Sequence, residues 1–173
     1  MAGALRGRRI EAPPGSATRP TMDRARQATF NALESLGAVE GAAVVDAYAG
    51  SGAMGIEALS RGAASCTFIE RDRAALDVLE RNVAALGLAD RSRIMRGDPL
   101  ALLGGCTGAT LVLADPPYGF AEWARLLGVV PAGFVVAESD RSLAGESPPI
   151  EGWETVRERR YGRATVSFLR RLA

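Results

Sequence analysis

The chain has 173 residues, of which 47% are hydrophobic and 24% are charged, and its formal net charge is only +1. This length and composition are typical of one soluble globular domain that is large enough to bury a core. No apolar run is long enough to span a bilayer, and residues 1–15 lack the apolar middle region of a signal peptide. We therefore expect a cytoplasmic protein without a membrane partner.

Two residue types are absent from the sequence, and each absence excludes a class of chemistry. Without histidine there is no Ser-His-Asp or Cys-His catalysis and no histidine metal site. Without lysine there is no Schiff-base chemistry and no P-loop lysine. Cys66 and Cys106 lack metal-ligand spacing, so we expect free thiols and no metal. Any chemistry must come from carboxylates, hydroxyls, backbone groups or a cofactor.

The basic groups, all arginines, are concentrated at the two ends of the chain. Residues 1–30 carry four more arginines than acidic residues, and a second arginine group lies between positions 157 and 171. Basic ends on a neutral body suggest an anionic partner, although solvated termini give the same pattern. Nucleic-acid contacts would use guanidinium groups, which bind phosphate bidentately and stack on bases.

In chain order, residues 1–20 predict an extended arm that is rich in arginine, proline and glycine. A helix is predicted next, beginning at Thr21 or Asp23 and ending at Gly37. Apolar strands then alternate with helices, two of which end at Gly62 and Gly87. The predicted strands cover residues 42–48, 65–70, 92–97, 109–115 and 133–139, and a short helix covers 121–128.

Continuous apolar strands that alternate with helices predict an α/β fold with three layers, in which helices cover both faces of a doubly wound parallel sheet. Residues 153–171 differ, because two β-rich runs joined by Tyr-Gly-Arg predict an antiparallel hairpin. We expect residues 1–37 to form a basic arm and helix packed on the core, and residues 38–173 to form the main domain.

A glycine loop follows the first predicted strand. Gly50, Gly52 and Gly55 fit G-x-G-x-x-G at a strand-to-helix turn, where backbone without Cβ atoms can lie against a nucleotide-type cofactor. The second strand ends at Glu70, which could accept hydrogen bonds from both hydroxyls of a ribose. A tight turn without a ligand and a solvated carboxylate would look similar in sequence.

The carboxylates around this loop indicate which cofactor would fit. Asp46 lies in the first strand, Glu57 in the following helix, and Asp98 after the third strand. A pyrophosphate would be repelled by such a set, whereas S-adenosylmethionine carries a sulfonium and an ammonium and has no phosphate. Asp46 could meet the ammonium and Asp98 the adenine amine, unless Asp98 only caps a helix.

The fourth predicted strand ends on Asp115-Pro116-Pro117-Tyr118. A strand can end on prolines simply because proline cannot continue a ladder. Two prolines in a row also fix φ and remove two N–H groups, so Asp115 and the Pro116 carbonyl would form a rigid pair of acceptors. Such a pair suits the exocyclic amine of a nucleobase, and Tyr118 offers a face on which the base could stack.

With DPPY after the fourth strand and DAYAGSGAMG after the first, the sequence resembles the class I S-adenosylmethionine-dependent amino-methyltransferases. The C-terminal hairpin is similar to the reversed last strand of that fold. The stretch RGRRI…TRPTMDRARQATFNAL, together with AGSGAMGIEALSRGA, more narrowly resembles the RsmD family of bacterial 16S ribosomal RNA guanine methyltransferases. The resemblance covers nearly the whole chain.

The resemblance implies a Rossmann-like, mostly parallel seven-stranded sheet with an antiparallel last strand. It implies methyl transfer from S-adenosyl-L-methionine to the amine at ring position two of a guanine, with S-adenosyl-L-homocysteine as the product. The implied partner is 16S rRNA, within a 30S subunit or an assembly intermediate, and we expect a monomer.

The family's functional residues map onto positions of this chain in three groups. The catalytic role falls on Asp115, Pro116, Pro117 and Tyr118. The cofactor role falls on Asp46, Gly50, Gly52, Glu70 and Asp98. The N-terminal signature, expected near the methionine end of the cofactor or the RNA unless it only caps the helix and anchors the arm, comprises Arg19, Thr21, Asp23, Arg26, Phe30 and Asn31.

Two features depart from the family pattern: MAGAL replaces an RIIGG-like strand before RGRR, and the segment after DPPY is compact. Other functions also stay open. DPPY serves adenine or cytosine amines in DNA or another RNA as well. An NAD-dependent dehydrogenase would use a similar glycine loop, and a non-catalytic nucleic-acid-binding domain would keep the arginines.

Overall fold

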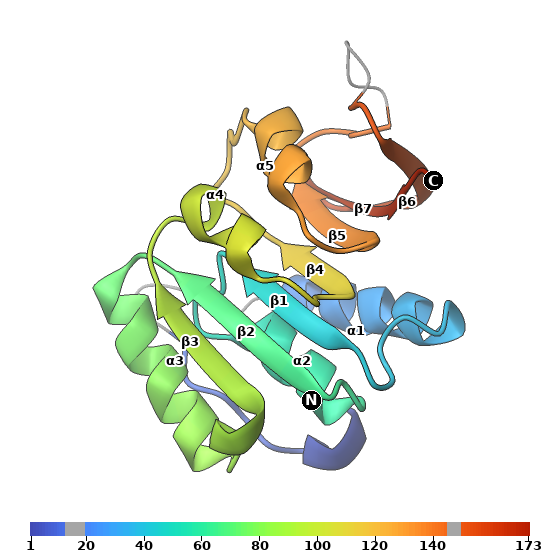
Figure 1. Ribbon diagram of the computed structural model, residues 1–173. Helices are drawn as coiled ribbons and strands as arrows, with labels where there is room; N and C mark the ends of the chain where they lie inside the picture. Colours follow the sequence, from blue (N-terminus) through green and yellow to red (C-terminus); the bar gives the residue numbers. More distant parts are fainter. Residues whose placement is uncertain (13–19, 145–149) are drawn as a thin grey trace.

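The computed structural model describes residues 1–12, 20–144 and 150–173 (Figure 1). Its helices are α1 (Pro20–Ser35), α2 (Ala53–Ser60), α3 (Arg73–Ala85), α4 (Pro99–Leu102) and α5 (Trp123–Val129), with 3-10 turns η1 (Gly3–Leu5), η2 (Ala89–Arg91) and η3 (Leu103–Gly105). Its strands are β1 (Ala43–Ala47), β2 (Ser65–Glu70), β3 (Ser92–Arg96), β4 (Leu111–Ala114), β5 (Phe134–Ser139), β6 (Trp153–Tyr161) and β7 (Ala164–Arg171).

The strands form one seven-stranded sheet in the order β3-β2-β1-β4-β5-β7-β6. The strands from β3 to β5 are parallel, whereas β7 runs antiparallel to β5 and β6 runs antiparallel to β7. The predicted parallel sheet that ends in an antiparallel hairpin is therefore confirmed.

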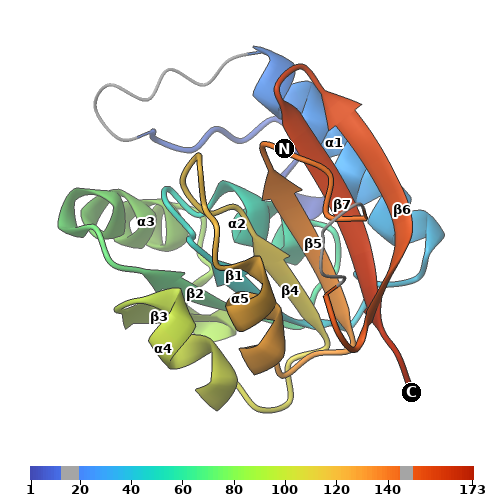
Figure 2. The same cartoon turned by 90° about the horizontal axis from the view of Figure 1, so that it is seen from above.

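Helices cover both faces of the sheet, as Figures 1 and 2 show. One face packs with α1, α2 and α3 in a single apolar cluster, and the other packs with α4, η3 and α5. The three-layer α/β architecture is confirmed by this arrangement. Within the described ranges, no helix combines the length and the apolar character needed to cross a membrane.

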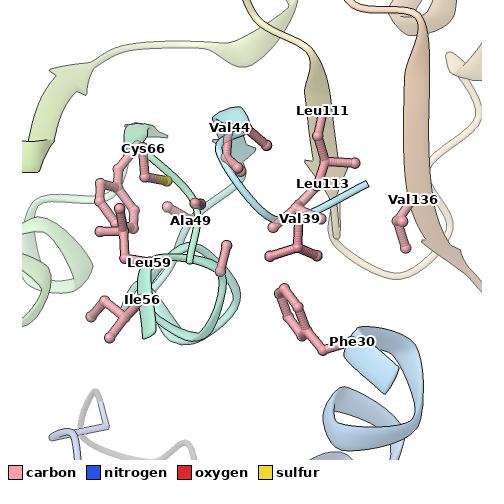
Figure 3. Packing of buried hydrophobic residues seen from close by; sticks show 14 of the residues in the cluster. Phe30, Val39, Val44, Ala49, Ile56, Leu59, Cys66, Leu111, Leu113 and Val136 are labelled. Atoms are coloured by element: carbon pink, nitrogen blue, oxygen red, sulfur yellow. The ribbon is translucent and has the colours of Figure 1, made fainter. Parts of the chain in front are cut away.

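Successive residues of each central strand point to opposite faces of the sheet. Val44 packs on the face of α1 to α3, and Val45 packs on the face of α4 and α5. Figure 3 shows Phe30 of α1 directed toward Val39 and the β4 residue Leu113. Because both faces are buried, these strands are continuous apolar runs in the sequence.

The first twelve residues pack on the core, so this part of the expected arm is not free. The N–H of Leu5 donates to Ser60 Oγ at 2.9 Å, and the N–H of Ala2 donates to Glu57 Oε1 at 3.2 Å. Gly3 has φ +69°, and a Cβ there would collide with the carbonyl of Ser60. The atypical MAGAL start thus forms a 3-10 turn docked on the C-terminal end of α2.

Three helix starts differ from the sequence prediction, and one of them is that of α5, which begins at Trp123 rather than at residue 121. α1 begins at Pro20 rather than at Thr21 or Asp23, because a proline has no N–H to lose and its fixed φ suits the first turn. The short helix α4 corresponds to the alternative in which Asp98 caps a helix, although its range was not predicted. It begins after Asp98, whose Oδ1 accepts the N–H of Leu100 at 3.0 Å.

Candidate active site

The carboxyl ends of the parallel strands meet at one edge of the sheet, and the strand order reverses there between β1 and β4. In doubly wound sheets, ligands bind in the crevice at this edge. Two cavities open at it, of about 310 Å³ and about 280 Å³. Asp115 and Glu138 line both of them, so the cavities adjoin.

The three glycines of the loop between β1 and α2 serve different purposes. Gly50 and Gly52 have φ of +55° and +83°, which favour glycine. A Cβ on Gly52 would collide with Leu79, and one on Gly55 would collide with Phe68. A Cβ on Gly50 would meet nothing within 4 Å. Gly52 and Gly55 therefore allow tight packing of α2, while Gly50 leaves its backbone open to a ligand.

Glu70 at the end of β2 lies directly against this loop. Its Oε2 accepts the N–H of Gly50 at 2.8 Å, and its Oε1 accepts those of Arg71 and Asp72 at 2.7 and 2.8 Å. Because each carboxylate oxygen can accept two hydrogen bonds, Oε2 keeps one acceptor position. The three backbone donors hold the carboxylate in a fixed orientation.

Asp46 is buried beneath the start of α2. Its Oδ2 accepts the N–H of Gly55 at 2.8 Å, and its side chain lines the 280 Å³ cavity. Burial raises the pKa of Asp46 to about 8, and the charges of Asp115 and Glu70 also raise it, against the effect of the Gly55 hydrogen bond. This carboxyl group both fixes the glycine loop and faces the cavity.

Asp98 is exposed and forms the N-cap of α4 through its bond to the N–H of Leu100. Capping by itself explains an aspartate at this position. The charge of Asp98 also contributes to the raised pKa of Tyr48, after burial of the tyrosine. Asp98 therefore lies near the end of β1, as well as capping α4.

Tyr48 is a residue of this edge that sequence reasoning missed. It has φ +66°, the one positive φ among the described non-glycine residues, and its buried hydroxyl has no hydrogen-bond partner there. Its ring meets Phe120 edge to face at 5.7 Å between centroids, and Phe120 meets Trp123 at 5.2 Å. Strained backbone of this kind is concentrated at ligand sites.

The DPPY segment forms one wall of the 310 Å³ cavity. Pro116 is buried, whereas Tyr118 is 74% exposed. The carbonyl of Pro117 accepts the N–H of Phe120 at 3.2 Å and closes a turn. Within the described ranges, no donor reaches the carbonyl of Pro116. This carbonyl is thus available to a ligand.

Asp115 and Glu138 stand side by side at the end of β4 and β5. Ala114 pairs with Ala137 in the parallel register, so the next residue of each strand lies on the same face of the sheet. Among the residues that the structure describes, neither carboxylate has a hydrogen-bond or ion-pair partner. The sequence missed Glu138, although it ends an apolar strand just as Asp115 does.

The surroundings of these two carboxylates disfavour their charged forms. Asp115 is exposed as a whole residue, although its carboxyl group is poorly solvated. This poor solvation, followed by the charge of Glu138, raises the pKa of Asp115. Desolvation likewise raises the pKa of Glu138. A ligand that donates hydrogen bonds would relieve both groups.

The members of the N-terminal signature whose side chains the structure describes, Asp23, Arg26, Phe30 and Asn31, line neither cavity. Arg19 lies outside the described residues, and Thr21 lies in the first turn of α1. Phe30 is fully buried in the core, and the exposed Asn31 accepts a bond from Arg61 at 2.9 Å. These contacts anchor α1. The α1 residue that lines the 280 Å³ cavity is Thr29, which the sequence did not single out.

The remaining signature residues, Asp23 and Arg26, belong to an ion-pair cluster around the buried Glu57 of α2. Arg26 pairs with Asp23 at 3.0 Å and lies 3.8 Å from Glu57 Oε2. Glu57 is fully buried, and its Oε1 accepts from Arg61 Nε at 2.7 Å. Glu57 therefore lines neither cavity, contrary to the expected carboxylate-lined pocket.

The second arginine group lies on the hairpin of β6 and β7. All its members are exposed: Arg157, Arg159, Arg160, Arg163, Arg170 and Arg171. Arg171 also packs its guanidinium 4.5 Å from the centre of the Trp153 ring and donates to the carbonyl of Ala132 at 3.3 Å. The hairpin therefore presents basic groups at one end of the sheet.

Together, the sheet topology, the glycine loop with its strand-end acid, and the DPPY cavity define a class I methyltransferase of Rossmann-like fold. Residues 1–170 match the family model described as Conserved hypothetical protein 95. The chain belongs to this family, which includes the RsmD proteins that its motifs resemble.

Three similar proteins match between 68% and 100% of this chain. YlbH of Bacillus subtilis (strain 168) is 32% identical over 99% of this chain and 97% of its own length. Ribosomal RNA small subunit methyltransferase D of Escherichia coli (strain K12) is 40% identical over 68% of this chain and 59% of its own length. The solved structure of yhhF from Escherichia coli has a TM-score of 0.86 and 32% identity, covering 100% of this chain and 97% of that one.

Proposed function

We propose that this protein transfers a methyl group from S-adenosyl-L-methionine to the exocyclic amine at ring position two of a guanine in 16S rRNA. The observation that carries the proposal is a pair of acceptors, the Asp115 carboxylate and the Pro116 carbonyl, which have no donor among the described residues and lie at the edge where the strand order reverses between β1 and β4. Membership of the family supports the substrate class.

The glycine-loop half of the edge would hold the cofactor. The open backbone at Gly50 and the remaining acceptor position of Glu70 suit a ribose. Asp46, in the adjoining cavity, would ionise beside a bound ammonium, because a nearby positive charge favours the carboxylate. Asp98 and the ring of Tyr48 lie near the end of β1, where an adenine would fit. The cofactor supplies an electrophilic methyl group on sulfur.

The DPPY half would orient the amine. The amine of guanine is a poor nucleophile because its lone pair is delocalised into the ring. Asp115 and the Pro116 carbonyl would accept hydrogen bonds from the two N–H groups of the amine and so turn its lone pair toward the methyl carbon. The cofactor would supply the methyl group, with its sulfur keeping the electron pair of the C–S bond, and Asp115 or water would take the proton that the amine loses. Orientation and electrostatics supply most of the gain.

Tyr118 would stack on the base after the base leaves the RNA helix. Its exposed ring needs no rearrangement to do so. We propose that residues 1–37 form a basic arm and helix packed on a main domain of residues 38–173. The arginines of this arm and helix and those of the β6–β7 hairpin would bind phosphates of the RNA on either side of the target base. We infer that the substrate is a 30S subunit or an assembly intermediate and that the protein acts in the cytoplasm as a monomer.

The decisive experiment incubates the protein with methyl-labelled S-adenosylmethionine and 30S particles from a strain that lacks the enzyme. Mass mapping of the RNA should find one methyl group on the amine of one guanine. Label on adenine or cytosine would replace the proposed substrate with another amine. Calorimetry with S-adenosylmethionine, S-adenosylhomocysteine and NAD tests the cofactor separately, and binding of NAD alone would refute it.

A further inference from the structure

Glu138 has no part in the mechanism described above, yet it occupies a central place in the site. It lines both cavities, and it stands next to Asp115 on the same face of the sheet. A carboxylate at the end of β5 therefore lies within reach of any base that Asp115 holds.

The polar contacts of the 310 Å³ cavity distinguish Asp115 and Glu138 from Asp140, the third acid there. Asp140 accepts the N–H of Gly119 at 3.2 Å and lies 3.6 Å from Arg141. In the described part of the chain, neither Asp115 nor Glu138 has such a partner. Two adjacent poorly solvated carboxylates without donors are costly, and the cost falls when a ligand donates hydrogen bonds to them.

The Watson–Crick edge of guanine offers donors in the matching arrangement. Its N1–H and its amine lie next to each other, so a base held by its amine at Asp115 would direct N1–H toward the neighbouring strand end. Adenine and cytosine present a ring-nitrogen lone pair beside their amine. That lone pair would face the negative charge of Glu138 without a hydrogen bond between them.

We propose that Glu138 accepts the N1–H of the target guanine and thereby selects guanine against other amine-bearing bases. This assignment rests on the proposed function, since it requires that the amine is held by Asp115 and the Pro116 carbonyl. Glu138 is a specificity-determining residue, because it contacts the base but not the reacting nitrogen.

The test compares guanine with 2,6-diaminopurine, which keeps the amine at position two but has a lone pair at N1. Once the methylated guanine is mapped, that nucleotide is replaced by ligation, and the RNA is assembled into small-subunit particles. The wild-type protein should prefer guanine by about 100-fold in kcat/KM, the scale of one hydrogen bond to a charged group. In Glu138→Gln the amide can donate to N1, so the preference should fall at least about tenfold.

Glu154→Gln is the matched control, because Glu154 is exposed on β6 and pairs only with Arg170 among the described residues. It should keep the wild-type preference. Calorimetry with S-adenosylmethionine verifies that each variant is folded and binds the cofactor.

The outcomes separate this inference from the proposed function. If the wild-type protein methylates guanine and Glu138→Gln keeps the full preference, Glu138 does not select the base. If Glu138→Gln instead loses affinity for S-adenosylmethionine with its base preference unchanged, the residue belongs to the ammonium site and the inference is overturned. If the wild-type protein does not methylate guanine at all, the proposed function fails first.

Discussion

The carboxylates on the two sides of the candidate active site differ in their hydrogen bonding. On the β1–β2 side, Glu70 accepts three backbone N–H groups and Asp46 accepts the N–H of Gly55. On the β4–β5 side, Asp115 and Glu138 have no partner among the residues that the structure describes. Acidic side chains thus hold backbone N–H groups on the β1–β2 side and lack donors from the described residues on the β4–β5 side.

This difference suits the two sides of the site to different roles, cofactor binding on the β1–β2 side and orientation of the substrate on the β4–β5 side. Satisfied carboxylates fix the glycine loop before any ligand arrives, and such preorganisation lowers the cost of binding. Unsatisfied carboxylates store an electrostatic cost that a hydrogen-bond donor relieves. We therefore expect substitutions on the β1–β2 side to affect stability and cofactor affinity, and substitutions on the β4–β5 side to affect turnover.

The largest expected effect is on the free energy of unfolding, when the buried ion pair between Arg61 and Glu57 of α2 is broken. Arg61→Ala would leave Glu57, which is fully buried, without its 2.7 Å partner. Breaking a buried pair costs about 3–5 kcal/mol, and because Arg26 still lies 3.8 Å from Glu57 Oε2 we expect the low end of that range. Urea denaturation should show a loss of this size in the free energy of unfolding.

Arg81→Ala provides the control for this measurement. Arg81 pairs with Glu11 at 3.0 Å, but both side chains are more than half exposed. Exposed pairs contribute about 0–1 kcal/mol, so this variant should unfold almost like the wild type. Equal losses in the two variants would show that burial of Glu57 does not set the cost.

The second effect concerns turnover on the other side of the comparison. Asp115→Ala removes one of two acceptors for the amine, and loss of one such preorganised group lowers kcat by about 10²–10³-fold. Its affinity for S-adenosylmethionine, measured by calorimetry, should stay close to that of the wild type. Asp77→Ala, an exposed acid on α3, is the control. Wild-type turnover by Asp115→Ala would contradict the assigned role.

A smaller effect is expected at Tyr118. Tyr118→Ala removes the proposed stacking face, worth about 1–3 kcal/mol, and should lower kcat/KM for the RNA accordingly. Tyr118→Phe keeps the ring and should retain most of the activity. Because the side chain is 74% exposed, neither change should alter thermal stability. Equal losses in both variants would assign the effect to the hydroxyl group instead.

A further prediction concerns the pH dependence of the free energy of unfolding at Asp46. Its folded-state pKa is about 8, against an ordinary value of 3.8. The native protein thus keeps a proton that the unfolded chain releases in this window, so this group's contribution to stability falls as pH rises from about 4 to about 8. Asp46→Asn removes that titration and keeps an oxygen for the N–H of Gly55.

The advantage of Asp46→Asn over the wild type in the free energy of unfolding should therefore grow with pH up to about 8 and then level off. Denaturation series at several pH values measure this trend, with Asp77→Asn as the exposed control. A difference that does not vary with pH would mean that Asp46 is already ionised in the folded, unliganded protein.

Much of the fold follows from local sequence patterns. Residues 42–45 and 111–114 are apolar throughout, a pattern typical of strands that are buried on both faces. The glycine spacing after β1 placed the loop correctly. The start of α1 and the short helix α4 were predicted less well, because proline in a first turn and an Asp-Pro cap are short signals with several outcomes.

The sequence by itself determined the layered sheet, the glycine loop and the acidic and proline-rich strand end, because each depends on residues that are close in the chain. Only the tertiary structure decided which carboxylates are satisfied. Glu70 meets Gly50 across β1 and β2, and Glu138 meets Asp115 across β4 and β5, through strand register. Register is set by burying both faces of the sheet together, and this cooperative packing has no local signature in the sequence.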